Sequence, residues 1–163
     1  MNFIDYSTTW AKSEVIQGRI MILIGLLAIV AFIVILRSEH ELLRGSLIPL
    51  GILIFMMIGY GGFIIYSRPA HSKQAIALYQ ENQAEALQKE KAKHIADNNI
   101  GGPALKIYPI LALLALATIY LNFGVRYQGM ALGFAVLFVA MYIMDYGFVS
   151  RSEGFLKFLE GLA

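Results

Sequence analysis

The chain has 163 residues, of which 58% are hydrophobic and only 15% are charged, so it has too little charge to cover a soluble domain of this size. Its net charge of +2 gives no basis for nucleic-acid binding, and the absence of cysteine excludes disulfides, Cys-ligated zinc and thiol catalysis. The composition therefore predicts a protein that crosses a membrane several times.

Four apolar segments, taken in chain order, are each long enough to cross a bilayer. Runs of about 17 to 20 residues match roughly 30 Å of hydrocarbon at 1.5 Å per residue, and lipid leaves the helix as the only plausible backbone form for them. Asp145 is the only charged residue within the four segments. We expect an all-α polytopic membrane protein with one membrane domain and spans over residues 20–36, 47–66, 107–123 and 130–149.

The first apolar segment is expected to remain in the chain as a span. A segment containing Asp5 and Glu14 precedes it, and the residues Arg37, Ser38 and Glu39 after it offer no small-residue cleavage site. These flanks differ from those of a secretory signal peptide.

Residues 67–106, between the second and third spans, form the one sizeable polar segment. From Ala70 to Asp97 it is rich in Ala, Gln, Glu and Lys, which predicts a single long cytoplasmic helix of about 42 Å. Asn98 and Asn99, followed by Gly101–Pro103, would end this helix. We expect it to be a connector lying against neighbouring protein, or alternatively a docking helix for a partner or for another copy of the chain.

The tail, residues 150–163, is predicted to form a short amphipathic helix. Ser150 and Glu153 have the spacing of a capping box, and the apolar residues after them recur every three or four positions. Such a helix suits the inner membrane interface or the cytoplasmic end of the bundle.

The distribution of Lys and Arg predicts the orientation of the spans. Arg37, Arg44 and Arg126 flank the spans on one side, and the other ten of the 13 basic residues lie in the N-terminal segment, residues 67–106 and the tail. Since Lys and Arg accumulate on the cytoplasmic side, we expect both termini in the cytoplasm. The short loops favour a multi-pass protein of a bacterial plasma (inner) membrane.

Small residues recur on one face of several predicted spans. In lipid, such faces allow helix backbones to approach closely, either within one bundle or between copies. The candidate helix-packing residues are Gly129, Gly133, Ala140 and Gly147 on the fourth span, and Gly51, Gly59 and Gly62 on the second.

Asp145 is the main candidate for chemistry because a carboxylate is costly within a membrane. It could form a structural ion pair with Arg68, His71 or Arg151, or lie exposed to water at the end of its helix. Alternatively it could be part of an ion or proton site, for which the candidate residues are Asp145, Tyr142, Tyr146, Asn122 and Thr118.

No nucleophile elbow, metalloprotease motif or glycine-rich nucleotide loop occurs in the sequence. We therefore expect a non-enzymatic protein without a cofactor or a metal site. Its expected partners are membrane lipids and either itself or another membrane protein, in a homo-oligomer or as an accessory subunit. An ion or small-solute channel or transporter using Asp145 is the alternative.

The last three spans, with a long cytoplasmic helix between the first two of them, resemble the core of the YidC-type membrane insertases in outline. This resemblance implies an insertase-like or lipid-handling role. It rests on architecture alone, because the sequence has a single predicted helix where those proteins have a coiled-coil pair.

Overall fold

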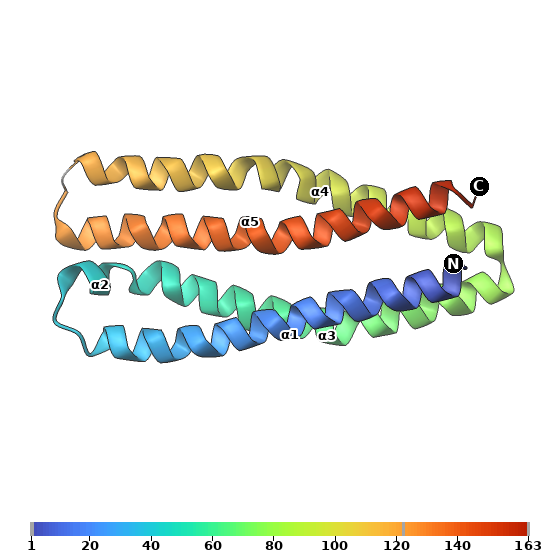
Figure 1. The fold of residues 1–163 in the computed structure, drawn as a ribbon, viewed down its shortest axis with the longest axis horizontal. Coiled ribbons are helices and arrows are strands. Elements are labelled where there is room, and N and C mark those ends of the chain that lie inside the picture. Colours follow the sequence, from blue (N-terminus) through green and yellow to red (C-terminus); the bar gives the residue numbers. More distant parts are fainter. Residues whose placement is uncertain (1, 122, 163) are drawn as a thin grey trace.

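The computed structural model describes residues 2–121 and 123–162 as an elongated antiparallel bundle of helices (Figure 1). A short helix and a 3₁₀ turn complete it, and the described residues contain no β-strand. In chain order the elements are α1 (Phe3–Leu36), α2 (Glu41–Gly45), α3 (Leu47–Glu81), α4 (Gln83–Ala117), η1 (Thr118–Leu121) and α5 (Val125–Glu160).

The bundle consists of two helical hairpins that lie side by side. Helix α1 packs along α3, and α4 packs along α5, while α3 also contacts α4 and α5. Both termini and the turn at Asn82 lie at one end of the bundle, and α2 and η1 lie at the other (Figure 1). The same end therefore holds all three segments whose Lys and Arg residues predict a cytoplasmic location, namely the N-terminal segment, residues 67–106 and the tail.

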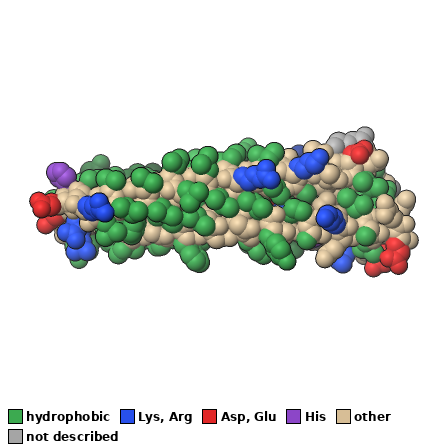
Figure 2. Space-filling view, turned by 90° about the horizontal axis from the view of Figure 1, so that it is seen from below, with side chains coloured by type: hydrophobic (Ala, Val, Ile, Leu, Met, Phe, Trp, Pro, Cys, Tyr) green, Lys and Arg blue, Asp and Glu red, His purple; other side chains and the backbone are tan. Residues whose placement is uncertain are grey.

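Each long helix exceeds what a bilayer requires. The four helices have 34 to 36 residues, or about 50 Å at 1.5 Å per residue, against roughly 30 Å of hydrocarbon. All four contain a stretch that is long and apolar enough to cross a membrane. On the face seen in Figure 2, hydrophobic side chains cover the stretch between the charged group at one end and the centre, and charged side chains lie over the other part of the molecule.

The bundle is best described as two halves. We call residues 20–66 and 107–149 the apolar half, and residues 3–19, 67–106 and 150–160 the polar half. The core of the apolar half consists of Met21, Leu53, Met57, Leu137 and Met144. The core of the polar half is mostly aromatic and contains Phe3, Trp10, Ala11, Ala75, Phe155 and Leu159.

The predicted single helix from Ala70 to Asp97 is wrong, because the chain reverses at Asn82. This residue is extended, with φ −146° and ψ 96°, and its side-chain oxygen accepts a hydrogen bond from the backbone of Glu85 at 3.2 Å, which caps α4. The predicted stop at residues 101–103 is also wrong, since α4 continues through it. A Cβ on Gly101 would lie 2.5 Å from Val149, so this glycine allows α4 and α5 to approach closely.

The tail is not a separate amphipathic helix either. Ser150 lies inside α5, which continues without a break to Glu160. The apolar face predicted for the tail is nevertheless used, because Phe155 and Leu159 are buried in the polar half. Packing against α1 and the α3–α4 turn region extends the helix past the predicted boundary.

Glycines allow α1 and α3 to cross at close range near the junction of the two halves. A Cβ on Gly18 would lie 2.9 Å from the backbone oxygen of Gly61, and one on Gly61 would lie 2.8 Å from that of Gly18. Side chains at these positions would force the two helices apart.

Candidate functional site

Glu14 lies at the centre of a buried charge network in the polar half. Only 1% of this residue is exposed, and its carboxylate accepts a hydrogen bond from Arg151 Nε at 2.6 Å. Arg68 Nε lies 3.4 Å from the other carboxylate oxygen. Burial raises the pKa of Glu14, while the charges of Arg151 and Arg68 oppose this rise. One carboxylate on α1 thus binds a guanidinium from α3 and another from α5.

Gln17, one turn further along α1, extends this network towards the apolar half. Its amide donates to the backbone oxygen of Met144 at 2.8 Å, and its side-chain oxygen accepts from Arg151. Gly147 provides the space, because a Cβ there would lie 2.7 Å from the Gln17 side chain. Since α1 and α5 otherwise have few contacts, these hydrogen bonds connect the two hairpins.

Trp10 lies within reach of two cationic groups of the polar half. The guanidinium carbon of Arg68 lies 5.2 Å from the centre of the indole ring, and the ammonium of Lys93 lies 5.0 Å from it. Both distances allow cation–π attraction. The indole nitrogen is buried without a hydrogen-bond partner among the described residues.

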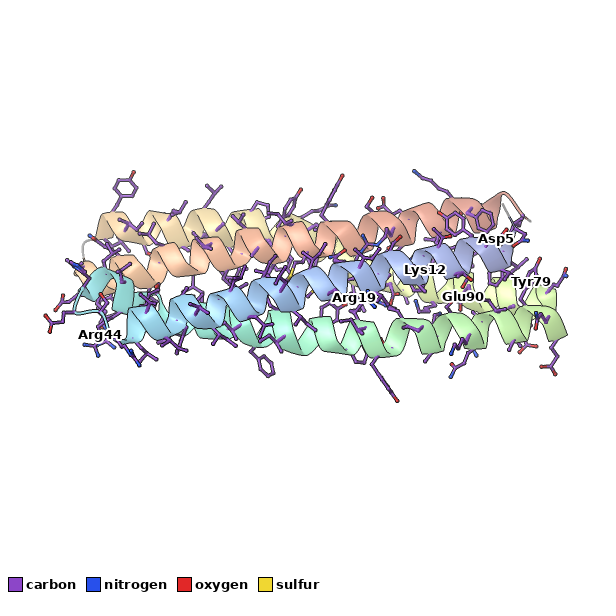
Figure 3. The ribbon with its side chains drawn as sticks, turned by 60° about the horizontal axis from the view of Figure 1, so that its bottom comes forward. Asp5, Lys12, Arg19, Arg44, Tyr79 and Glu90 are labelled. Carbon is purple, nitrogen blue, oxygen red and sulfur yellow. The ribbon has the colours of Figure 1, made fainter. Side chains whose placement is uncertain are left out.

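A second buried polar cluster joins α3, α4 and α5 around Glu90. The His71 ring and the Glu90 carboxylate are 3.0 Å apart, and the Nδ1 atom of His94 lies 2.8 Å from the Ser152 hydroxyl. Figure 3 shows Glu90 within the bundle at the end that also carries Asp5 and Tyr79, with Arg44 at the opposite end.

The two buried groups of this cluster have shifted pKa values. Burial lowers the pKa of His94 to about 4, so this fully buried ring is neutral at physiological pH. Burial alone would raise the pKa of Glu90, but the hydrogen bond and the charge of His71 outweigh it and leave the pKa below its ordinary value. Glu90 is therefore charged in the folded protein.

Asp145 has a different partner from those expected. Tyr108 on α4 donates a hydrogen bond to its carboxylate at 2.7 Å. Arg68 and Arg151 bind Glu14 and His71 binds Glu90, so these contacts replace the expected pairing with Asp145. The sequence positions of these residues do not determine which side of each helix faces Asp145.

The other residues of the candidate ion site do not gather around Asp145. Tyr142 and Tyr146 are exposed and stack on each other with ring centres 6.2 Å apart. Thr118 lies in η1, at the far end of the bundle, and its hydroxyl donates to the backbone oxygen of Ala115. Asn122 lies outside the described residues.

The candidate packing residues divide into two groups. On α5, Gly129 lies against the backbone of Leu42, Gly133 against Pro49 and Ser46, and Gly147 against Gln17, while Ala140 packs on the apolar core. On α3, Gly51 is in ordinary contact with Phe32, but a Cβ on Gly59 or Gly62 would meet nothing within 4 Å. The α3 glycines at 59 and 62 are therefore not needed for packing within the described chain.

Comparison of the chain with protein-family models, with curated proteins and with solved structures gave no match. Function is therefore inferred from the geometry of the described residues.

Proposed function

We propose that the chain is a non-enzymatic, multi-pass protein of the plasma membrane that acts as a homo-oligomer or as a subunit of a membrane complex. The exposed surface of the apolar half supports insertion. Large side chains such as Leu27, Val34, Leu113 and Ile143 are each more than 60% exposed, and all four long helices carry exposed side chains of this kind. A surface this apolar is suited to lipid and would aggregate in water.

The charges of the polar half support an orientation with both termini in the cytoplasm. Ten of the 13 Lys and Arg residues belong to this half, together with both chain ends and the Asn82 turn. Helices of about 50 Å would extend roughly 20 Å beyond the hydrocarbon on this side. The polar half would then be a four-helix bundle in the cytoplasm.

The observation that carries the assembly proposal is an unfilled face on α3. Gly59 and Gly62 line it, with Phe55 76% exposed on one side and Tyr66 83% exposed on the other. Glycine in a helix costs about 1 kcal/mol relative to alanine, and no contact within the described chain offsets this cost here. Contact with a second backbone in the membrane would offset it.

A second copy of the chain is the simplest occupant of this face. All copies insert with the same orientation, so a two-fold axis along the membrane normal brings the same face of each copy together at the same depth. The open space beside Gly59 in one copy would then face the same open space in the other copy. Phe55 and Tyr66 would pack at the edges of the contact.

Cysteine cross-linking can test this proposal on a clean background, because the natural chain has no cysteine. We expect Gly59→Cys to form a disulfide-linked dimer under mild oxidation in native membranes. Ile20→Cys is the matched control. Gly18 packs on Gly61, so Ile20 lies near the level of Gly59, and it is 51% exposed on α1. We expect this variant to remain uncross-linked.

The native mass of the mildly solubilised protein distinguishes the two forms of the proposal. A dimer mass with efficient Gly59→Cys cross-linking supports the homo-oligomer. A single copy that co-purifies with another membrane protein supports the accessory subunit. A lone monomer with no partner and no cross-link contradicts both.

An insertase-like role is the second candidate, favoured by one observation. Residues 67–106 contribute to an antiparallel helix pair and not to a single helix, which brings the outline closer to the YidC-type insertases. Against this, Trp10 and Phe155 from the neighbouring helices cover the inner face of the pair. If the role is correct, depletion of the protein in its host should slow the insertion of other membrane proteins, and unchanged insertion would contradict it.

A further inference from the structure

A polar cavity of about 210 Å³ lies where the two halves of the bundle meet. All four long helices contribute to it. Its polar lining includes Glu14 from α1, Arg68 from α3, Asp97 and Asn98 from α4, and Asp145 and Ser152 from α5. The carboxylates outnumber the single guanidinium in this lining.

Among the described residues, Glu14 and Asp97 have cationic partners, whereas Asp145 has none. Glu14 binds Arg68 and Arg151, and Asp97 binds Lys93 at 3.1 Å. Within residues 2–121 and 123–162, no Lys, Arg or His forms an ion pair with Asp145, and its one hydrogen bond comes from Tyr108. A carboxylate that is partly removed from water and has no cation beside it is costly unless it binds a proton or another cation.

Two further atoms in the lining also have unmet hydrogen-bonding capacity. The indole nitrogen of Trp10, a residue only 5% exposed, and the side-chain oxygen of Asn98 are buried without a partner among the described residues. An unmet donor and an unmet acceptor in one cavity are the partners that water requires. At about 30 Å³ per water molecule, the cavity has room for several.

The position of Asp97 indicates where the cavity meets solution. Its side chain is 45% exposed, and it lies on the polar-half side of the lining, while Asp145 lies on the apolar-half side. Water in the cavity would therefore connect the membrane-embedded carboxylate with the solution around the polar half.

We propose that Asp145 is a proton-binding site that exchanges protons with the cytoplasmic solution through this water-filled cavity. A proton is favoured over a multivalent metal ion because the described residues contain no group of three or more His, Asp or Glu placed to hold a metal. The inference rests on the proposed membrane insertion and orientation, but it does not depend on the proposed assembly. The titratable and charged groups that face Asp145 or the cavity are Glu14 from α1, Tyr60 and Arg68 from α3, Asp97 and Tyr108 from α4, and Arg151 on α5.

Carbodiimide labelling tests the proton site on the purified full chain in mild detergent. A carbodiimide reacts with a protonated carboxyl group, which gives its proton to a nitrogen while its oxygen adds to the central carbon; rearrangement then leaves a stable N-acylurea. We expect the hydrophobic dicyclohexylcarbodiimide to label Asp145, with less labelling as the pH rises, because only the protonated carboxyl group reacts. Peptide mass spectrometry locates the label directly, and Asp145→Asn should lose it.

Access through the cavity is tested with a water-soluble carbodiimide and a matched pair of variants. Asn98→Phe would fill the cavity and exclude water, so we expect labelling of Asp145 to fall about tenfold. Asn99→Phe changes the exposed neighbour and should label like the natural chain. Far-UV circular dichroism verifies that both variants are folded, because Trp10 lines the cavity and its emission would respond to the substitution itself.

Three results would overturn the proposal. The first is the absence of label on Asp145 at any pH with either reagent. The second is labelling by the hydrophobic reagent alone, which would mean access from lipid and not from the cavity. The third is equal labelling of folded Asn98→Phe and Asn99→Phe by the water-soluble reagent.

Discussion

The apolar half and the polar half are built from the same four helices, yet their interiors are opposite in character. The apolar half has a core of methionine and leucine closed by glycine contacts, as at Gly129 and Gly133. The polar half buries Glu14, Glu90 and His94 beside aromatic rings. The more charged interior therefore belongs to the half whose surroundings are proposed to be water.

This contrast follows from the different driving forces for helix packing in lipid and in water. In lipid, burying an apolar side chain gains little, so close backbone packing must hold the helices together. In water, burial of rings such as Trp10 and Phe155 is strongly favourable and can offset the cost of buried charge. The charges then connect the two hairpins, because Glu14 on α1 binds both α3 and α5.

The largest expected effect comes from removing the central charge. Glu14→Gln leaves Arg68 and Arg151 partly buried without their carboxylate, and we expect a loss of about 3–5 kcal/mol of stability. Trp10 emission reports on the polar half alone and far-UV circular dichroism on the whole bundle. In thermal melts, the emission transition should therefore move to lower temperature while much of the helical signal persists.

An exposed carboxylate provides the control for this variant. Glu153→Gln lies on α5 near Arg151, but Glu153 is exposed and should leave both transitions unchanged. Combining Glu14→Met with Arg68→Met and Arg151→Met should recover much of the loss, because no charge is then left unpaired. Equal melting of Glu14→Gln and the natural chain would mean that the network does not stabilise the polar half.

Acidification is the next largest expected effect, and it acts through His94. The ring is neutral in the folded state with a pKa of about 4, whereas the unfolded chain has the ordinary value of 6.5. The stability from His94 is therefore complete above pH 6.5 and declines as the pH falls towards 4, by roughly 3 kcal/mol in total. The lowered pKa of Glu90 adds a loss in the same direction.

Substitution of His94, followed through the Trp10 emission, shows whether this residue causes the pH dependence of stability. His94→Gln can still bond to Ser152 but cannot titrate in this range, so its Trp10 transition should depend less on pH. His40→Gln, at an exposed residue near α2, should keep the full dependence. If His94→Gln retained the same pH profile as the natural chain, another group would be responsible.

The four long helices were predictable from the sequence, whereas the polar interior was not. Hydropathy over about 20 residues identifies a span because it averages over all faces of a helix. The network depends on which face each residue occupies. Glu14 looked like an ordinary flanking charge, yet the buried residues of α1 recur every three or four positions through Phe3, Ser7, Trp10, Glu14 and Gly18. That spacing was the available signal.

The errors in residues 67–106 have a related cause. Local propensity favoured a continuous helix through Asn82 and a stop at Gly101–Gly102, and tertiary packing reversed both expectations. The reversal at Asn82 lets Ala75 and Leu87 contribute to one core. The glycine at 101 lets α4 continue while it lies close to Val149 on α5. These constraints come from other helices and are not visible in a local window.

Glycine substitutions provide a smaller effect that tests the packing of the apolar half. Gly129 lies against the backbone oxygen of Leu42, so Gly129→Ala must displace α2 and should cost about 1–3 kcal/mol. In a detergent that keeps the chain monomeric, Gly62→Ala meets open space and should be neutral or stabilise the helix by up to about 1 kcal/mol. Far-UV circular dichroism melts in detergent would measure both variants. Equal melting of the two variants would mean that the contact with Leu42 does not limit the size of the residue at position 129.

The smallest expected effect concerns one hydrogen bond in the polar half. The hydroxyls of Ser7 on α1 and Ser72 on α3 are 3.1 Å apart and buried. Either single change to alanine leaves the other hydroxyl without its partner and should cost about 1 kcal/mol, whereas the double change should cost less than the sum because neither hydroxyl remains. Trp10 emission melts of the two single variants and the double variant form a double-mutant cycle. An additive cycle would mean that the two hydroxyls do not interact and that water already reaches this part of the core. The interior of the polar half would then be hydrated, and its polar groups would not be held by buried contacts with one another.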